Sequence, residues 1–309
     1  MSPPRLILVL SENWTLTPPR DLRALVRIAQ EAETAGVDAV MLSEHVVLGS
    51  ASGAGGIMGN PRDYAAPGNQ DPATPWPDSL VLASAIAAST TRLRIALAAV
   101  IYPLRHPLLL AKQLATLDLL SEGRLVVQPT VSWHEQEYEA LGVPFHRRGA
   151  ILDEQLDAMS AAWRDTPASY DGEHFRFADV YVEPKPFRPE GPRMWFGGQS
   201  LHPALLRRLV RCGHGFHPFG SPTLEELERL RAALAEAGRD IAELELVGGI
   251  RGTFTDETSV AELGQAAEAI PAQLAQGYTS ICFKPSMFTD DSEEVGVLCR
   301  ELVARTAAF

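Results

Sequence analysis

Short apolar segments alternate along the chain with longer segments whose apolar positions recur at helical spacing. Leu22, Leu25, Val26, Ala29 and Ala32 illustrate the helical pattern, in steps of three and four residues. Most of the short segments are apolar on both faces, which is typical of strands in a buried parallel sheet. The pattern predicts strands at residues 5–10, 38–43, 93–100, 124–129, 193–198, 214–219, 244–250 and 279–283.

Several residues mark the expected ends of the helices. Gly36 and Gly123 are placed to stop the helices that precede them, and Pro107 suits a first helical turn. Thr223 to Glu226 and Ser259 to Glu262 have the spacing of a capping box. These signals agree with the alternation of strands and helices, and they predict where several of the helices begin or end.

Alternating strands and helices predict an α/β fold, a (β/α)₈ TIM barrel forming one domain over residues 1–309. A Rossmann-type sheet is the alternative, but it needs a GxGxxG turn directly after a strand, and the glycines of residues 53–59 have the wrong spacing. Long insertion loops are expected after the second strand, at about residues 46–76, and before the fifth, at about residues 167–192. Alternation at residues 174–177 predicts a small hairpin in the latter.

Composition narrows the class of protein. The chain is 46% hydrophobic and 21% charged, a balance typical of soluble globular proteins. Its net charge of −12 argues against nucleic-acid or anionic-membrane partners, which need clustered Lys and Arg. Cys212, Cys282 and Cys299 are scattered, and the first apolar run, of about five residues, is too short for a signal peptide. We expect a cytoplasmic protein.

The motifs exclude several kinds of chemistry. His134 and Glu135 open an HExxH pattern, but Tyr138 stands where the second histidine is required, so no metal site is expected. GxSxG and P-loop motifs are absent from the sequence. The strand ends offer neutral hydrogen-bonding groups and one imidazole, His45. Such a lining suits a polar organic cofactor better than nucleophilic hydrolysis.

Four ordered segments carry a family resemblance, at residues 32–47, 102–125, 137–159 and 183–200. The most specific is YPLRHPLLLAKQLATLDLLSEGRL, which leads from the third helix into the fourth strand. On these segments the chain resembles the bacterial luciferase-like superfamily, whose members use FMN or the deazaflavin coenzyme F420. It is most similar to the branch of single-chain F420-dependent oxidoreductases.

The resemblance implies a cofactor lying across the carboxyl ends of the strands, with its ring near strands two to four and its phosphate near the loop after strand five. It implies His45 as the catalytic residue, with Glu44 positioned to orient it. The expected cofactor-binding residues are Ala99, Val100, Thr130, Ser132, Tyr138, Arg147, Gly197, Gly198, Gln199 and Ser200. The expected substrate pocket is lined by Trp14, Tyr64, Trp76, Trp133 and His217.

Three further features of the expected site concern its backbone and the starts of two helices. The family's non-proline cis peptide is expected at Ala99–Val100. Ser132 is expected either to bond the cofactor or to cap the next helix, in a segment where relatives have GVGxGW and this chain has bulkier residues. Ser200 is expected to cap the helix that faces the phosphate.

Two enzymatic functions and one binding function remain. The first is F420-dependent hydride transfer to or from a small organic substrate. The second is monooxygenation with reduced FMN and O₂, which needs a partner flavin reductase. The third is a non-catalytic flavin-binding relative. The resemblance also implies a possible homodimer and leaves the substrate unnamed.

Overall fold

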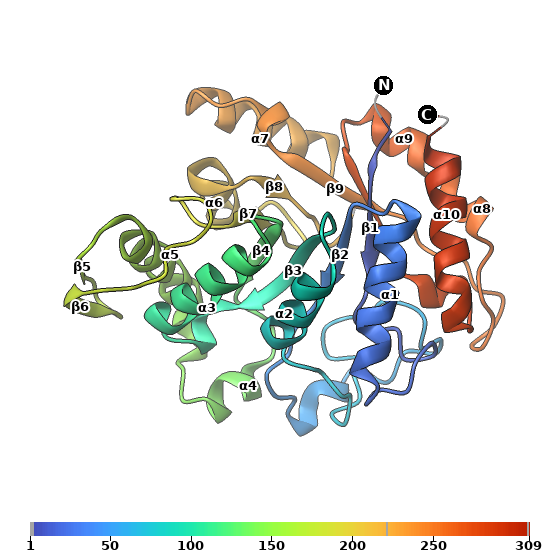
Figure 1. The fold of residues 1–309 in the computed structure, drawn as a ribbon, viewed down its shortest axis with the longest axis horizontal. Coiled ribbons are helices and arrows are strands. Elements are labelled where there is room, and N and C mark those ends of the chain that lie inside the picture. The colour runs from blue at the N-terminus through green and yellow to red at the C-terminus, as the bar shows by residue number, and fades with distance from the viewer. Residues whose placement is uncertain (1–2, 221, 308) are drawn as a thin grey trace.

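Eight parallel strands close into a barrel, as the hydrophobic pattern predicts (Figure 1). The structure is a computed structural model and describes residues 3–220, 222–307 and 309. Each strand pairs in parallel with the next along the ring, and β10 closes the ring on β1. The barrel strands are β1 (Arg5–Val9), β2 (Ala39–Leu42), β3 (Arg94–Ile101), β4 (Leu125–Thr130), β7 (Arg193–Phe196), β8 (Gly215–Phe216), β9 (Glu245–Gly249) and β10 (Ser280–Phe283).

Helices connect the strands and cover the outside of the barrel (Figure 1). They are α1 (Leu22–Ala35), α2 (Ser79–Ser89), α3 (Pro107–Leu120), α4 (Glu135–Ala140), α5 (Arg148–Arg164), α6 (Pro203–Cys212), α7 (Leu224–Glu236), α8 (Leu263–Ala267), α9 (Ile270–Ala275) and α10 (Val295–Thr306). Within the described ranges, none of the helices has the length and apolar character needed to cross a membrane.

Some of the helix ends follow the sequence signals and others do not. Gly36 ends α1 in the left-handed conformation, with φ 93°. The predicted capping box at Thr223 and Glu226 is present at the start of α7. The second predicted capping box is wrong, because Glu262 itself caps α8 and accepts from the backbone of Gly264 and Gln265. A carboxylate at that position satisfies the free amides without help from Ser259.

Two apolar layers explain why the strands are hydrophobic on both faces. One large cluster lies between the strands and the surrounding helices. A smaller cluster fills the inside of the barrel, and it includes Ile7, Met41, Val126, Trp195 and Cys282. Since neighbouring side chains on a strand point to opposite faces, seven of the barrel strands supply both layers, and β8, which consists of Gly215 and Phe216, supplies only the outer one. The barrel is therefore a filled core, and ligands must bind at one of its ends.

The hairpin predicted before the fifth barrel strand is also present. It consists of β5 (Ala168–Asp171) and β6 (Arg176–Val180), which pair antiparallel and lie at the edge of the molecule (Figure 1). The other long insertion, here called the mouth loop (residues 46–78), follows β2 and contains a short 3₁₀ turn, Ser50–Gly53. In Figure 1 the barrel strands run toward the lower side of the view, where α4 and the mouth loop lie.

Candidate active site

His45 lies three residues after β2, at the carboxyl end of the barrel, and its side chain is buried among aromatic rings. Its ring centroid is 5.2 Å from that of Trp76 and 5.8 Å from that of Trp133, in edge-on arrangements. Trp14, from the loop after β1, lies 5.6 Å from Trp76. Two of the predicted pocket residues, Trp76 and Trp133, therefore contact the predicted catalytic histidine, and a third, Trp14, packs behind Trp76.

Glu44 does not orient His45, and that expectation is wrong. Its buried carboxylate forms a two-pronged ion pair with Arg105, at 2.6 and 3.0 Å. It also accepts from the backbone N–H of Ile101 at 2.9 Å and from the Ser79 hydroxyl at 3.2 Å. Neighbouring residues in an extended segment point to opposite sides, so Glu44 ties β2 to β3 and α2 while His45 faces the barrel mouth.

The carboxylate that does contact His45 belongs to Glu137 in α4. Its Oε2 lies 3.4 Å from Nδ1 of His45, across 92 residues of sequence. Its Oε1 accepts from the backbone N–H groups of Val46, at 2.5 Å, and Val47, at 3.2 Å. The sequence analysis missed Glu137, because a glutamate in a short helix with two others is ordinarily a solvated residue.

The end of β3 carries a bulge and a non-proline cis peptide bond. The cis bond joins Ala98 and Ala99, so the expected position at Ala99–Val100 is wrong by one residue. The pairing of β3 with β4 shifts between Ala98 and Val100, which leaves Ala99 as the extra residue. Ala99 is partly exposed whereas Val100 is fully buried, so only Ala99 of the predicted pair can face a ligand.

Gln128 in β4 presents an unpartnered donor close to the predicted site. Its Oε1 lies 2.9 Å from Nδ1 of His217, at the end of β8, while its Nε2 is buried with no hydrogen-bond partner among the described residues. The Nε1 atoms of Trp76 and Trp195 are in the same situation. Burial lowers the pKa of His217 to about 4, so its ring is neutral at neutral pH.

Thr130 and Ser132 occupy the turn that leaves β4. The Thr130 hydroxyl accepts from the Ser132 N–H at 3.3 Å, and Ser132 has a positive φ of 55°. Ser132 does not cap α4, because the N-cap residue is His134. A positive φ is the conformation that glycine adopts readily, so Ser132 stands where the glycine-rich relatives would be unstrained.

Tyr138 and Arg147, both expected to bind the cofactor, have partners within the protein. Tyr138 is fully buried and its hydroxyl donates to the carbonyl of Val131, so it is already used. Burial raises the pKa of this phenol. Arg147 is exposed and pairs at 2.6 Å with Glu173 in the β5–β6 turn. Both residues therefore support local structure here.

Gly197 to Ser200 follow β7 as predicted, but their surroundings differ from the expected anion cradle. A Cβ on Gly197 would lie 1.8 Å from the carbonyl oxygen of His217, so this glycine permits close backbone packing. Gly198 is half-buried, and Gln199 and Ser200 are exposed. His202, not Ser200, caps α6 by accepting from the Leu205 N–H.

The backbone N–H groups beside this segment already bind a carboxylate of the protein. Glu226 of α7 accepts from the Leu201 N–H at 2.8 Å and from the Thr223 N–H at 3.0 Å. These backbone hydrogen bonds lower the pKa of Glu226, so it is ionised at neutral pH. This carboxylate would repel a second negative group binding here, and Arg229, which donates to the Leu201 carbonyl, offsets part of that repulsion.

The remaining predicted pocket residue, Tyr64, has no ring contact with Trp14, Trp76 or Trp133 in the described structure. It packs against the apolar inside of the barrel, and Nζ of Lys284 lies 5.2 Å from its ring. Lys284 follows β10, is fully buried, and donates to the carbonyl of Asp63 at 2.8 Å. The predicted pocket thus divides into Trp14, Trp76 and Trp133 near His45, and separate positions for Tyr64 and His217.

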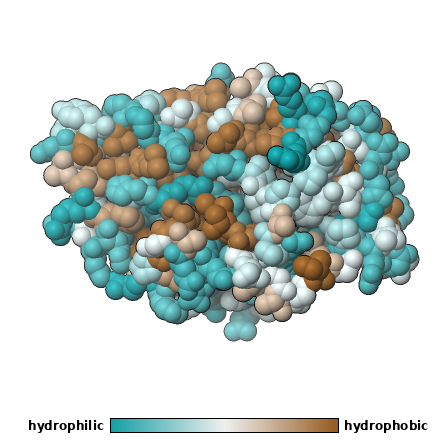
Figure 2. All heavy atoms as spheres, turned by 90° about the horizontal axis from the view of Figure 1, so that it is seen from below, coloured by the Kyte–Doolittle hydropathy of each residue, from teal (hydrophilic) through white to brown (hydrophobic). Residues whose placement is uncertain are grey.

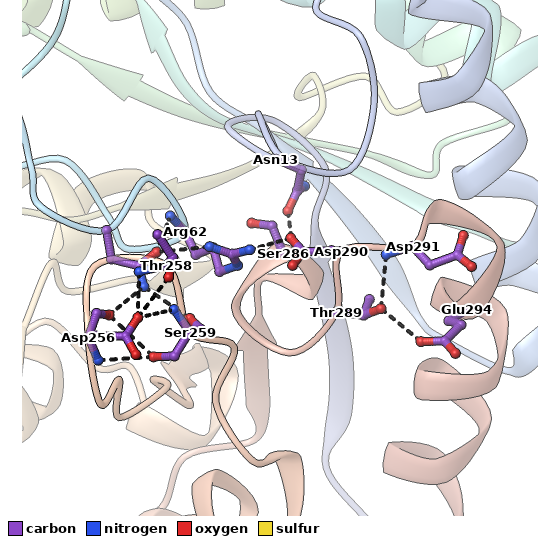
Figure 3. A network of polar contacts seen from close by, with 11 residues as sticks. Asn13, Arg62, Asp256, Thr258, Ser259, Ser286, Thr289, Asp290, Asp291 and Glu294 are labelled. Carbon is purple, nitrogen blue, oxygen red and sulfur yellow. Dashed lines mark hydrogen bonds and ion pairs between the residues drawn. The ribbon is translucent and has the colours of Figure 1, made fainter.

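The mouth loop is fastened at both sides of the barrel end. Near its start, the N–H of Gly49 donates to Nε2 of His134 at 2.6 Å. Further along, the Asn60 amide donates to the carbonyls of Asp256 and Ser259, at 3.2 and 3.0 Å. Arg62 pairs with Asp290, beside the turn that contains Asp256 and Ser259 (Figure 3). The loop therefore bridges from α4 to the segments after β9 and β10.

Cavities lie at opposite ends of the barrel in the described part of the chain. A cavity of about 570 Å³ lies at the amino end, beside Arg5, Arg193 and His214. A cavity of only about 20 Å³ lies at the carboxyl end, beside Trp14. Figure 2 views the carboxyl end, where hydrophobic and hydrophilic residues are interspersed. The small cavity is not lined by His45. We place the site beside His45 at the carboxyl end, because barrel active sites form there and the buried donors of Gln128 and Trp76 have no partners in the described structure.

Comparison with known proteins identifies the family. Residues 5–288 match the sequence profile described as luciferase-like monooxygenase, so the chain belongs to the luciferase-like monooxygenase family. An uncharacterised protein of Mycobacterium tuberculosis is 43% identical over 169 residues, which are 54% of this chain and 57% of that relative. The match thus covers little more than half the length of this relative.

Two further similarities concern the cofactor. The FMNH₂-dependent dimethylsulfone monooxygenase of Pseudomonas putida is 32% identical over 126 residues, 40% of this chain and 34% of that protein. The structure of the coenzyme F420 dependent tetrahydromethanopterin reductase from Methanopyrus kandleri superimposes with a TM-score of 0.71 at 13% identity, covering 99% of both chains. At that identity the superposition supports the barrel fold alone.

Proposed function

We propose that this protein is an oxidoreductase that binds coenzyme F420 across the carboxyl ends of β2, β3 and β4. It transfers hydride to or from a small organic substrate. The observation that carries the proposal is the buried His45 ring, enclosed by tryptophans and backed by the Glu137 carboxylate. A buried imidazole with a carboxylate partner can hold or move a proton next to a reacting carbon.

The residues at this end fit a ring cofactor. The deazaflavin edge carries carbonyl oxygens and ring nitrogens that accept hydrogen bonds, and Nε2 of Gln128 and Nε1 of Trp76 are buried donors without partners. Ala99 offers a small side chain at the bulge of β3. F420, when bound, supplies the carbon that gives or takes the hydride. The chain orients the ring, excludes water with its tryptophans, and provides the proton at His45.

The choice of F420 over FMN is supported by Glu226. The family resemblance puts the phosphate end of the cofactor near residues 197–200, where the Glu226 carboxylate binds the Leu201 N–H. FMN carries a phosphate monoester with close to two negative charges at neutral pH. At that position F420 carries a phosphodiester with one charge, and its tail carboxylates lie beyond it, so the repulsion at the Leu201 N–H itself is smaller for F420 than for FMN.

FMN-dependent monooxygenation is the second candidate. The similarity to the FMNH₂-dependent dimethylsulfone monooxygenase favours it. The fastened mouth loop favours it too, because oxygen chemistry on a reduced flavin requires that water be kept out. This function would require O₂ and a partner reductase.

Titration of the purified apoprotein with F420 and, separately, with FMN tests the proposal. The cofactor fluorescence reports binding directly. We expect F420 to bind with a micromolar dissociation constant and FMN to bind at least ten times more weakly. Micromolar binding of FMN with no response to F420 would overturn the proposal in favour of the second candidate. Binding of neither would favour a non-catalytic relative.

A further inference from the structure

Glu137 is distinguished from the other acidic residues of α4 by its burial. It is completely inaccessible to solvent, whereas Glu135 and Glu139 on the same helix are exposed. Among the described residues no lysine or arginine lies within ion-pair distance of its carboxylate. An ionised carboxylate without a cationic partner is unfavourable in a protein interior, so its hydrogen bonds must compensate for lost hydration.

The two oxygens of Glu137 have separate partners. Oε1 accepts both backbone N–H groups of Val46 and Val47 at the start of the mouth loop. Oε2 lies 3.4 Å from Nδ1 of His45 and is the oxygen that contacts the ring. One oxygen therefore holds the backbone that follows His45, and the other faces the ring itself.

His134 does not compete with Glu137 for the contact with His45. Its Nε2 accepts the Gly49 N–H at 2.6 Å, which requires that this nitrogen carry no proton. Burial lowers the pKa of His134, which keeps its ring neutral. The centroids of the His134 and His45 rings are 6.4 Å apart, so His134 contributes packing at this distance.

We propose that Glu137 is a positioning residue that fixes the tautomer of His45. A carboxylate accepts but cannot donate, so a neutral His45 ring beside it carries its proton on Nδ1. The unprotonated Nε2 is then left for the tryptophan-lined mouth, where it can accept a proton from the substrate or return one. This inference rests on the proposed function, in which His45 exchanges that proton.

Glu137→Gln inverts the expected tautomer while preserving shape. The amide oxygen of the introduced side chain takes the place of Oε1, because two backbone N–H groups require an acceptor there. The amide NH₂ then faces Nδ1 of His45 and donates to it, which moves the ring proton to Nε2. Glu139→Gln, an exposed change on the same helix, is the matched control.

The experiment is long-range ¹H–¹⁵N correlation NMR of the histidine rings in ¹⁵N-labelled apoprotein at pH 8. The spectrum of His45→Gln identifies the His45 signals. We expect protonated Nδ1 in the wild-type protein and in Glu139→Gln, and protonated Nε2 in Glu137→Gln. An unprotonated Nδ1 in the wild-type protein would overturn the inference, even where Glu137→Gln does not fold. An unchanged tautomer in folded Glu137→Gln would also overturn it.

Measurement of F420 binding on the same samples tests the proposed function separately from the role of Glu137 in fixing the His45 tautomer. Failure to bind F420 would remove the proposed function, whatever the tautomer of His45. Binding of F420 with the wrong tautomer would leave the proposed function standing and remove only the role of Glu137.

Discussion

Glu44 and Arg105 form a buried, two-pronged ion pair that joins the end of β2 to the segment after β3, with contacts of 2.6 and 3.0 Å. The side chain of Glu44 is 1% exposed and that of Arg105 is 13% exposed. The pair thus lies beside His45 without touching it, and it fixes the relative position of two strands whose ends form the candidate site.

Removal of Arg105 should destabilise the fold strongly. Arg105→Met leaves the Glu44 carboxylate buried without its cation, and losses of this kind are about 3–5 kcal/mol. The free energy of unfolding in urea is the measurement. The control is Arg305→Met, which breaks an exposed pair with Glu301 within α10 and should change stability by less than about 0.5 kcal/mol. An equal loss of unfolding free energy in the two variants would show that the buried pair of Glu44 and Arg105 stabilises the fold no more than the exposed pair does.

Ser132 should respond to substitution as a left-handed residue. Its φ is 55°, a conformation that is unfavourable for β-branched side chains. Ser132→Val is expected to lower the free energy of unfolding by about 1–2 kcal/mol, while Ser132→Gly is expected to keep wild-type stability. Urea denaturation of both variants measures the difference. A valine variant as stable as the glycine variant would mean that the turn adopts another conformation.

Stability should fall as the pH is lowered from about 6.5 toward 4, in part through His217. Burial lowers the pKa of this ring in the folded protein to about 4, below the value in the unfolded chain. Between those values the unfolded chain binds more protons, so acid favours unfolding, by up to about 1.4 kcal/mol per pH unit for one group. The lowered pKa values of His134, His202 and His214 act in the same direction.

His217→Asn isolates the contribution of His217, because an amide can still pair with Gln128 but does not titrate. The drop in unfolding free energy between pH 7 and pH 5 should be smaller in this variant than in the wild-type protein. An identical drop would assign the effect to the other histidines.

Arg62 should control how firmly the mouth loop is closed. Its guanidinium pairs with Asp290, and its side chain is largely buried. Arg62→Ala is expected to raise the rate of proteolysis within residues 46–78 about tenfold, as expected for loss of a charge-assisted hydrogen bond that resists local opening. Arg147→Ala, which removes an exposed pair with Glu173, is the control. Equal cleavage rates in the two variants would contradict a fastening role for Arg62.

The barrel could be predicted from the sequence because its signal is local. Segments such as RIALAAVI of β3 are short and apolar on both faces, which is typical of a strand between two apolar layers. The site was predicted less completely, because its key contacts join distant segments. Glu44 precedes His45 in the chain, whereas the contact comes from Glu137, 92 residues later.

At two other positions the structure differs from the expectation for physical reasons that a single sequence does not show. The cis bond lies one residue earlier than expected, because the bulge inserts Ala99 and shifts the register of β3 against β4. Tyr138 was expected to bind the cofactor, but the turn after β4 brings the carbonyl of Val131 to its hydroxyl. The register of a bulge and the path of a turn depend on tertiary packing, which periodicity does not encode.

The central claim is that F420 binds at the carboxyl end of the barrel, beside Ala99 and His45. Fluorescence titration of F420 into wild-type protein, Ala99→Leu and Arg193→Leu tests it most directly, since Arg193 borders the 570 Å³ cavity at the amino end. We predict that Ala99→Leu weakens binding at least about tenfold, a loss of about 1.4 kcal/mol, and that Arg193→Leu retains wild-type affinity. Wild-type affinity in Ala99→Leu together with lost binding in Arg193→Leu would contradict the account.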